Sequence, residues 1–456
     1  MTLHAAKNIH IVGIGGIGVS AIAKWALEQG KQVSGSDLRE NVTTVWLQAH
    51  GAHVHIGEHA AKHIPEHCDL ILHTVAVPSE NVERADAVAR GIPTMSYPEA
   101  VNELLQGKNS IAVAGTHGKS TTTAFLATIL MEAQRDPTVI VGTRLRAFGN
   151  TNERTGKGDD VLVEADEYNQ GILLYQPNHA IVLNVDHEHV DVYPTLADAV
   201  KAFSVFISHV PVAGTVTLNA DDPSLGVLTG ASGAKVQTFG FGQADLVARG
   251  IAHSERGTTF TVSGLYNGAV QSQLFGEHNV RNVLAAICVA HALSIPFAVV
   301  QRGVAAFPGT WRRFEQRGEW HGATIIDDYA HHPTEIAASL QAARQAFPGR
   351  RLISIFQPHL HSRTIAFASN FAKVLRTSDQ VILLDVYDVA GREDGPKADI
   401  DALANAIGPR TVRVSNVQAA LQAAANLVQP GDVILTLGAG DITHFADLAQ
   451  KENPSA

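Results

Sequence analysis

Cysteine and positive charge are both scarce in this sequence. The two cysteines, Cys68 and Cys288, cannot build a disulfide framework in a chain of 456 residues, which favours a reducing compartment. Lys and Arg number 34 against 44 Asp and Glu, so the formal net charge is −10. Because a nucleic-acid surface needs a basic stripe, this balance argues against a nucleic-acid partner.

Long apolar runs are also missing. The first residues, MTLHAAKNIH, lack a basic stretch followed by an apolar core, so no secretory signal peptide is expected. The most apolar long stretch, residues 284–300, contains His291, Ser294 and Pro296 and falls short of a membrane span. We therefore expect a cytoplasmic protein with no membrane insertion.

The sequence does contain repeated units of apolar run, glycine turn and helical pattern. At about 150 residues per domain the length suggests about three domains. We place them at 1–106, 107–315 and 316–456. Apolar runs recur at the intervals of parallel α/β sheets, and the glycine-rich alternation at 240–275 predicts β-hairpins. The predicted fold class is α/β, with ligands at the carboxyl ends of the strands.

The first glycine turn (residues 13–18) follows a predicted strand. Gly13, Gly15 and Gly18 form G-x-G-x-x-G, and Asp37 lies 19 residues beyond Gly18. Such glycines let backbone N–H groups approach a diphosphate at a helix N-terminus, and the acidic residue suits a ribose hydroxyl. The motif alone predicts a nucleotide diphosphate, with a nicotinamide cofactor or a purely structural turn as alternatives.

The second glycine turn (residues 115–120) has the sequence GTHGKS. Its backbone amides can cradle the phosphates of ATP, Lys119 can neutralise phosphate oxygens, and the Ser120 hydroxyl can bind Mg²⁺. A standard P-loop would have its first glycine at position 113, where this chain has valine. The turn is therefore predicted to be a shortened relative of the P-loop.

Carboxylates and imidazoles follow the next two predicted strands. Glu164-Ala-Asp-Glu167 closes one, and Asp186-His-Glu-His189 closes the other. Hard oxygen ligands at neighbouring strand ends favour Mg²⁺ on ATP phosphates, although a solvated acidic patch is the alternative. Most of the 23 histidines are expected on the surface, including His53, His55, His59 and His63.

Two further groups of polar residues lie later in the chain. Asn279 and Asn282 open a predicted helix, where their amides can read an adenine edge or simply cap the helix. Arg312 and Arg313 lie at the predicted boundary between the second and third domains, where either can reach a phosphate.

The densest group is Asp327-Asp328-Tyr-Ala-His331-His332 at another strand end, with His359 and Arg363 after the following strand. Arginine beside histidine suits the α-carboxylate of an amino acid, and a polar network without a ligand is the alternative.

Together these motifs resemble the Mur ligase family over essentially the whole chain. The resemblance rests on GIGGIGVSAIA, VSGSD, AVAGTHGKSTTT, VEADE, NVDHEHVDVY, GEHNVRNVLAA, GTWRRFE, DDYAHHPTE and FQPHLHSRT. It implies a Rossmann-like UDP-binding domain, a central ATPase domain and a Rossmann-like C-terminal domain. The implied activity is ATP-dependent ligation of L-alanine to the lactyl carboxylate of UDP-N-acetylmuramate through an acyl phosphate, a step of peptidoglycan precursor synthesis, by a monomer or homodimer.

The resemblance also implies roles for individual residues. UDP-sugar binding falls to Gly13, Gly15, Gly16, Gly18, Ser36 and Asp37. ATP binding falls to Gly115, Thr116, His117, Gly118, Lys119, Ser120, Thr121, Asn279, Asn282, Arg313 and Asp328. Ser120, Glu164 and His189 would hold Mg²⁺, and Tyr329, His331, His359 and Arg363 would surround L-alanine. The catalytic residues would be Lys119, Glu164, His189, Arg313 and Asp328.

Three positions depart from the family pattern. Ser120 replaces the usual threonine and keeps the hydroxyl, whereas Leu360 stands where many members have arginine. Lys201 lies two positions before the place of a carbamylated lysine, which Phe203 occupies, so that modification is not expected. The alternatives are a ligase that recycles the murein tripeptide onto the same sugar, a nicotinamide-dependent oxidoreductase and a P-loop ATPase that acts as a motor or switch.

Overall fold

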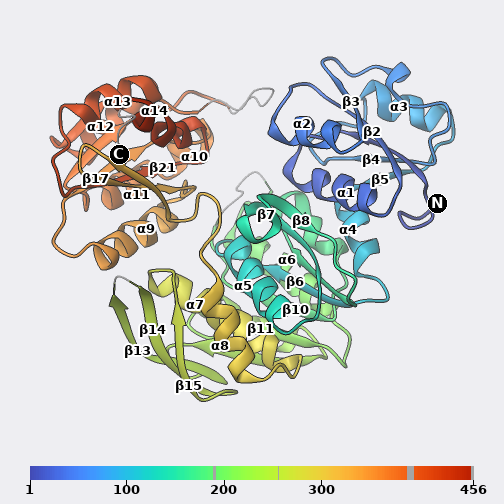
Figure 1. Cartoon of the computed structure of the whole chain (residues 1–456), viewed down its shortest axis with the longest axis horizontal. Coiled ribbons are helices and arrows are strands. Elements are labelled where there is room, and N and C mark those ends of the chain that lie inside the picture. The colour runs from blue at the N-terminus through green and yellow to red at the C-terminus, as the bar shows by residue number, and fades with distance from the viewer. Residues whose placement is uncertain (188–191, 255, 388–394, 453–456) are drawn as a thin grey trace. The chain divides into compact units, whose positions relative to one another are not determined.

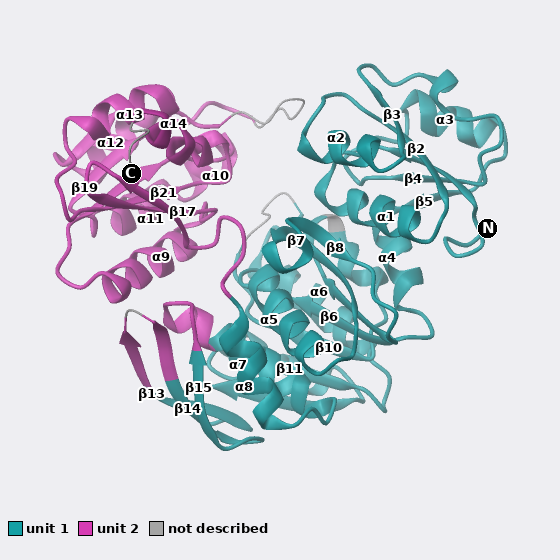
Figure 2. Ribbon diagram, in the orientation of Figure 1, with its two compact units in different colours: residues 1–250, 260–271, 281–307 teal, residues 251–259, 272–280, 308–456 magenta. Residues whose placement is uncertain are grey.

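A computed structural model of the chain describes residues 1–187, 192–254, 256–387 and 395–452. Its strands form three sheets with five, ten and six strands (Figure 1). The Cα trace divides into two compact units, coloured in Figure 2. Unit 1 comprises residues 1–250, 260–271 and 281–307, and unit 2 comprises residues 251–259, 272–280 and 308–456. Among the described residues, no helix combines the length and apolarity needed to cross a bilayer.

The first sheet is entirely parallel and has the order β3-β2-β1-β4-β5. Its strands are β1 (Asn8–Val12), β2 (Gln32–Asp37), β3 (His53–Ile56), β4 (Leu70–His73) and β5 (Thr94–Ser96). The helices of this segment are α1 (Ile17–Glu28), α2 (Val42–Ala49), α3 (Val82–Ala89) and α4 (Tyr97–Leu105). Parallel pairing brings the carboxyl ends of β1 and β2, and hence the first glycine turn and Asp37, to one edge.

The second sheet has the order β15-β14-β13-β12-β11-β10-β6-β9-β7-β8. Its strands are β6 (Asn109–Ala114), β7 (Thr138–Leu145), β8 (Thr151–Arg154), β9 (Asp160–Glu164), β10 (His179–Val182), β11 (Thr215–Asn219), β12 (Lys235–Gly240), β13 (Leu246–Ser254), β14 (Gly257–Gly264) and β15 (Gly268–Ser272). Its helices are α5 (Lys119–Glu132), α6 (Leu196–Ser208), α7 (Glu277–Ala292) and α8 (Phe297–Ala306). Strand β6 pairs in parallel with both β9 and β10, so the second glycine turn lies between the ends of those two strands.

The third sheet has the order β16-β17-β21-β18-β19-β20, in which only the β16–β17 pair is antiparallel. Its strands are β16 (Glu315–Trp320), β17 (Ala323–Asp328), β18 (Leu352–Phe356), β19 (Gln380–Leu383), β20 (Thr411–Arg413) and β21 (Val433–Leu437). Its helices are α9 (Pro333–Ala346), α10 (His361–Ala366), α11 (Ala368–Leu375), α12 (Ile400–Ile407), α13 (Val417–Ala425) and α14 (His444–Glu452).

Strand β17 shows why the third sheet is covered on both faces. Successive side chains of a strand point to opposite faces, so an unbroken apolar run needs cover on each side. Ile326 belongs to a core with residues of α9, α11 and α12, while Ile325 belongs to a core with residues of α13 and α14. The predicted α/β fold class is thereby confirmed. Where β-hairpins were predicted at 240–275, β13, β14 and β15 are successive neighbours in the second sheet, whereas β12 and β13 pair in parallel.

Candidate functional site

The second glycine turn joins β6 to α5 in a conformation that requires glycine. Gly118 caps α5 with φ +87°, and a Cβ there would lie 2.4 Å from Asn282 Oδ1. The turn is braced by Asn184, which accepts the His117 N–H at 2.8 Å and donates its amide to the His117 carbonyl at 2.9 Å. The N-terminus of α5 is thus presented with a close-fitting backbone, as an anion site requires.

Lys119 is the charged centre of this turn. Its side chain is 12% exposed, and its ammonium donates to the Gly115 carbonyl at 2.8 Å and to Glu167 Oε2 at 2.8 Å. Burial alone would lower the pKa of Lys119, but the carboxylates of Glu167, Asp166 and Glu164 outweigh it and raise the pKa. The lysine therefore carries a full positive charge beside the helix N-terminus.

Glu167 follows β9, and the sequence pattern alone predicts no role for it. Its side chain is 3% exposed, and burial raises its pKa to about 7 against the opposing effect of Lys119. The Tyr193 hydroxyl donates to the Glu167 carbonyl at 2.7 Å, which fixes the residue further. The position of Glu167 just after β9 could have suggested a functional carboxylate. That its partner is Lys119 could be known only from the fold.

Ser120 and Glu164 form an oxygen pair suited to a divalent cation. The Ser120 hydroxyl donates to Glu164 Oε1 at 3.0 Å, and the Gly142 N–H donates to Glu164 Oε2 at 2.6 Å. Burial raises the pKa of Glu164 against the opposing effects of Lys119 and these two donors. A half-buried carboxylate and a hydroxyl are hard donors, so the residues present fit Mg²⁺. His189, the predicted third ligand, lies outside the described residues.

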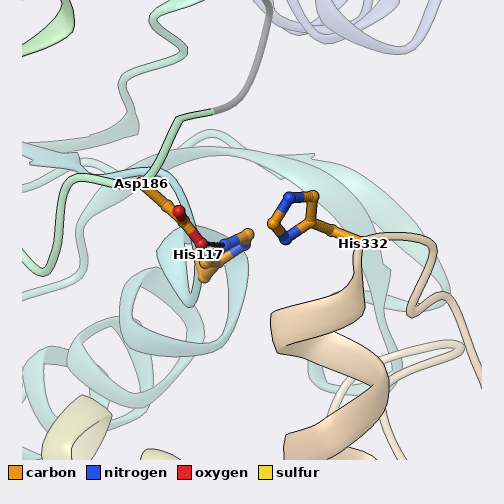
Figure 3. Close-up of side chains that lie close together, drawn as sticks. All are labelled: His117, Asp186 and His332. Atoms are coloured by element: carbon orange, nitrogen blue, oxygen red, sulfur yellow. Dashed lines mark hydrogen bonds and ion pairs between the residues drawn. The ribbon is translucent and has the colours of Figure 1, made fainter. Parts of the chain in front are cut away.

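His117 and Asp186 lie side by side at the ends of β6 and β10 in unit 1. His117 Nε2 is 3.1 Å from Asp186 Oδ2, the ion pair dashed in Figure 3. Thr116 strengthens the contact, because its hydroxyl accepts the Asp186 N–H at 2.9 Å. His332, also drawn in Figure 3, belongs to unit 2. His117 and Asp186 thus add an imidazole and a carboxylate to the turn.

The two predicted adenine-binding asparagines occupy the first turns of α7. Asn279 donates its amide to the Phe275 carbonyl at 2.8 Å, and both Asn279 and Asn282 are buried. In this bond the Asn279 side chain donates to a carbonyl. A side chain that caps a helix would instead accept backbone N–H groups, so this bond is not a helix cap. Thr121, another predicted ATP ligand, is buried in the first turn of α5.

The first glycine turn is held by an acidic residue. Asp37 Oδ2 accepts the Gly15 N–H at 2.9 Å, and a Cβ on Gly15 would lie 2.9 Å from that oxygen. Gly13 has φ +77°, Gly16 precedes α1, and Gly18 lies in its first turn. The structure brings these glycines and Asp37 together, as the sequence predicted.

Ser36 lies beside this turn but its hydroxyl is engaged elsewhere. It donates to Glu83 Oε2 at 2.6 Å and lies 2.9 Å from His59 Nδ1. Glu83 is fully buried, and its hydrogen bonds with His10, Ser36 and His63 outweigh burial and lower its pKa to about 2. His59 and His63 were expected on the surface, but their side chains are each only 13% exposed and both contact this buried carboxylate.

Unit 2 separates the roles of Arg312 and Arg313. Arg312 is 3% exposed, its Nε donates to Asp327 at 3.1 Å, and its other nitrogens donate to backbone carbonyls of unit 2. Arg313 Nη1 lies 3.6 Å from Glu335 Oε1, and its guanidinium faces the Tyr329 ring at 5.2 Å. Arg312 is therefore committed to the fold, which leaves Arg313 as the candidate phosphate ligand.

Asp328 ends β17 as a buried carboxyl group held by neutral donors. It accepts the Ser339 hydroxyl at 2.8 Å, the Phe314 N–H at 3.1 Å and the Ala330 N–H at 2.9 Å. Burial raises its pKa to about 6, although the charge of Arg313 and these hydrogen bonds act in the opposite direction.

The four residues assigned to L-alanine lie together in unit 2. The Tyr329 and His331 rings are 5.3 Å apart, the His331 and His359 rings are 6.0 Å apart, and Arg363 Nη1 is 3.3 Å from His359 Nδ1. His332, by contrast, caps α9 through a box with Glu335. Within unit 2, His331 rather than His332 thus belongs to this group.

Family sequence profiles match three consecutive segments of the chain. They are described as Mur ligase family, catalytic domain (residues 8–109), Mur ligase middle domain (residues 113–290) and Mur ligase, glutamate ligase domain (residues 312–440). The UDP-N-acetylmuramate–L-alanine ligase of Salinibacter ruber is 39% identical, over 99% of this chain and 96% of that protein.

Solved structures agree. The UDP-N-acetylmuramate–alanine ligase of Thermotoga maritima superposes with a TM-score of 0.83 at 28% identity, covering 98% of this chain and 99% of that one. A murein peptide ligase from Psychrobacter arcticus gives a TM-score of 0.74 at 25% identity, covering 98% of each chain. The predicted resemblance and three-domain architecture are confirmed, and the chain belongs to the Mur ligase family.

Proposed function

We propose that this protein joins L-alanine to the lactyl carboxylate of UDP-N-acetylmuramate at the expense of ATP, a step of peptidoglycan precursor synthesis. The observation that carries the proposal is the second glycine turn, where Lys119 and the Ser120–Glu164 pair meet at the N-terminus of α5. The likeness over the full chain to relatives named for this reaction supports it.

The reaction needs two bond exchanges. A lactyl carboxylate oxygen attacks the γ-phosphorus of ATP, and the bond from that phosphorus to the β–γ bridging oxygen breaks. The products are an acyl phosphate and ADP. The L-alanine nitrogen then attacks the acyl carbon, and inorganic phosphate departs with the carboxylate oxygen. The amine loses a proton as the amide forms, so a base must lie near the nitrogen.

The second glycine turn binds the nucleotide. Lys119 holds a positive charge against the phosphates, and the amides of residues 115–118 face them at the start of α5. Ser120 and Glu164, with His189, would hold Mg²⁺, whose positive charge on phosphate oxygens favours transfer of the phosphoryl group. The family resemblance assigns Asn279 and Asn282 to the adenine, and Arg313 and Asp328 to the nucleotide.

The other two substrates bind to the first and third sheets. The first glycine turn and Asp37 receive the UDP moiety, with Ser36 beside it. Tyr329, His359 and Arg363 receive L-alanine, and Arg363 pairs with its carboxylate.

His331 is suited to take the amine proton. Its Nδ1 lies 3.0 Å from the Tyr329 carbonyl and 3.3 Å from Glu335 Oε2. Two acceptors at Nδ1 favour the tautomer with the proton on that atom, which leaves the lone pair on Nε2.

The sheets also support a division into domains. We assign residues 1–106 to UDP-sugar binding, 107–315 to ATP binding and 316–456 to amino-acid binding, in a cytoplasmic monomer or homodimer.

Phosphate release tests the proposal. Purified protein is given ATP and Mg²⁺, with UDP-N-acetylmuramate and L-alanine added singly and together, and Lys119→Met serves as the inactive control. Release only with both substrates, and a product heavier by one alanyl residue, is the expected result. Release that requires the murein tripeptide instead of alanine would identify the tripeptide-recycling reaction. Release without any UDP-sugar would overturn the proposal.

A further inference from the structure

Asn152 joins the hairpin β7–β8 to helix α1, which lie side by side within unit 1 (Figure 1). The residue lies in β8 and is 1% exposed. Its Nδ2 donates to the Ile17 carbonyl and lies 3.4 Å from Ser20 Oγ, and its Oδ1 accepts the Lys24 ammonium at 2.7 Å. Both ends of the amide are thus committed to the first two turns of one helix.

Lys24 is an unusual partner for a packed interface. It is 5% exposed, and its ammonium faces the Trp46 ring at 4.9 Å. Burial lowers its pKa to about 8, while the carboxylate of Glu153 acts in the opposite direction. Glu153 is itself buried, and burial raises its pKa to about 7. Asn152 and Trp46 thus contact the ammonium, and the charges of Glu153 and Arg144 also act on its pKa.

Apolar side chains of similar size could hold the two elements together without the cost of burying these polar groups. Unlike apolar side chains, an amide that bonds one carbonyl and one ammonium is satisfied at only one position of α1 along the hairpin. The network therefore determines how α1 is placed along the hairpin, in addition to joining the two elements.

The two elements lead to two substrate sites. Ile17 is the first residue of α1, directly after Gly16 of the first glycine turn. On the other side β7 carries Gly142, whose N–H holds Glu164 at 2.6 Å, and β7 also pairs in parallel with β9, which ends at Glu164. A shift of α1 along the hairpin would displace the first glycine turn relative to the Ser120–Glu164 pair.

We propose that Asn152 is a positioning residue for the ligation: by pinning α1 to the β7–β8 hairpin, it sets the UDP-sugar carboxylate at the place where the phosphoryl group is transferred. This inference rests on the proposed function. It predicts a defect in turnover with both substrates bound, because the substitution changes no residue of either glycine turn.

The test compares Asn152→Ala with Asn178→Ala. Asn178 accepts the Ser110 N–H and hydroxyl, each at 2.9 Å, near the amino end of β6, so its loss removes a comparable set of bonds far from both turns. We expect kcat of Asn152→Ala to fall about tenfold to a hundredfold, as small misplacements of reacting groups do. The dissociation constants for ATP and for UDP-N-acetylmuramate, measured singly by calorimetry, should stay within about twofold. Asn178→Ala should lower Tm and leave kcat unchanged.

A second variant separates positioning from stability. In the double variant Lys24→Met, Asn152→Leu, apolar contacts replace the polar network, so Tm should return to or exceed that of the parent while kcat stays low. Recovery of kcat together with Tm would overturn the inference, as would an unchanged kcat in folded Asn152→Ala. If the parent enzyme itself forms no alanyl product, the proposed function fails instead.

Discussion

The two glycine turns of unit 1 are built alike and charged differently. Each follows a parallel strand and leads into a helix, α1 or α5, so each presents backbone N–H groups at a helix N-terminus. The first turn is held by a carboxylate, since Asp37 accepts the Gly15 N–H. The second is held by a cation, since Lys119 folds onto the Gly115 carbonyl and Glu167. The shared backbone predicts only a phosphate. Under the proposed function, the turn with Asp37 binds a diphosphate and the turn with Lys119 serves phosphoryl transfer.

The largest effect should come from removing the cation. Lys119→Met deletes the charge that faces the phosphates and leaves Glu167, Asp166 and Glu164 without their common partner. We expect kcat for phosphate release to fall roughly 10³-fold, the scale seen when a preorganised electrostatic group is lost. Circular dichroism should show a folded protein. A Lys119→Met variant with more than a tenth of the parent's activity would mean that the second turn does not depend on its cation.

Matched glycine substitutions should affect one substrate each. Gly118→Ala forces a left-handed residue and a Cβ 2.4 Å from Asn282 Oδ1, whereas Gly15→Ala places a Cβ 2.7 Å from Asn41 Nδ2 and 2.9 Å from Asp37 Oδ2. Strain of this kind costs about 1–3 kcal/mol, or roughly fivefold to 150-fold in affinity. KM for ATP should rise in Gly118→Ala, and KM for UDP-N-acetylmuramate in Gly15→Ala. The comparison fails if either variant raises both constants equally.

Removal of the Asp37 charge should have a smaller effect on the first turn. Asp37→Asn keeps an oxygen that can accept the Gly15 N–H but loses the charge-assisted bond. KM for UDP-N-acetylmuramate should rise about tenfold, with KM for ATP unchanged in the same steady-state assay. An equal rise in the ATP constant would show that Asp37 supports the fold and not the sugar nucleotide.

The smallest expected effect concerns Asp328, which, like Asp37, accepts hydrogen bonds from neutral donors. Its pKa is about 6 in the fold against an ordinary value of 3.8, so the folded state binds a proton within that window and stability falls as pH rises through it. Ser339→Ala removes the hydroxyl that favours the charged form and should raise the pKa further, at a cost of about 1 kcal/mol above pH 6.

Melting curves from pH 4 to pH 8 would show this as a gap in Tm between variant and parent that widens with pH. A gap independent of pH would contradict the assignment. Asp328→Asn is the control, because it should lack this component altogether.

Much of the fold and site could be predicted because strand, turn and helix signals are local. Residues adjacent in sequence predict the strands from their apolar runs, the glycine turns at 13–18 and 115–120, and helix α7. The family resemblance assigned a chemistry to these segments, and the comparisons support it. Long-range pairing was harder to predict. The choice between Arg312 and Arg313 has no local signature, because it depends on which side chain meets Asp327.

The sequence by itself determined where the strands end and that Gly-x-Gly, Lys and carboxylate groups follow those ends, since backbone conformation and apolar periodicity are properties of short segments. Only the tertiary structure decided the partners: Glu167 for Lys119, Glu83 for His59 and His63, and the first turns of α1 for Asn152. A polar group removed from water must find its hydrogen bonds within the protein, and the segments that supply them are brought together by packing of the cores rather than by proximity in the chain.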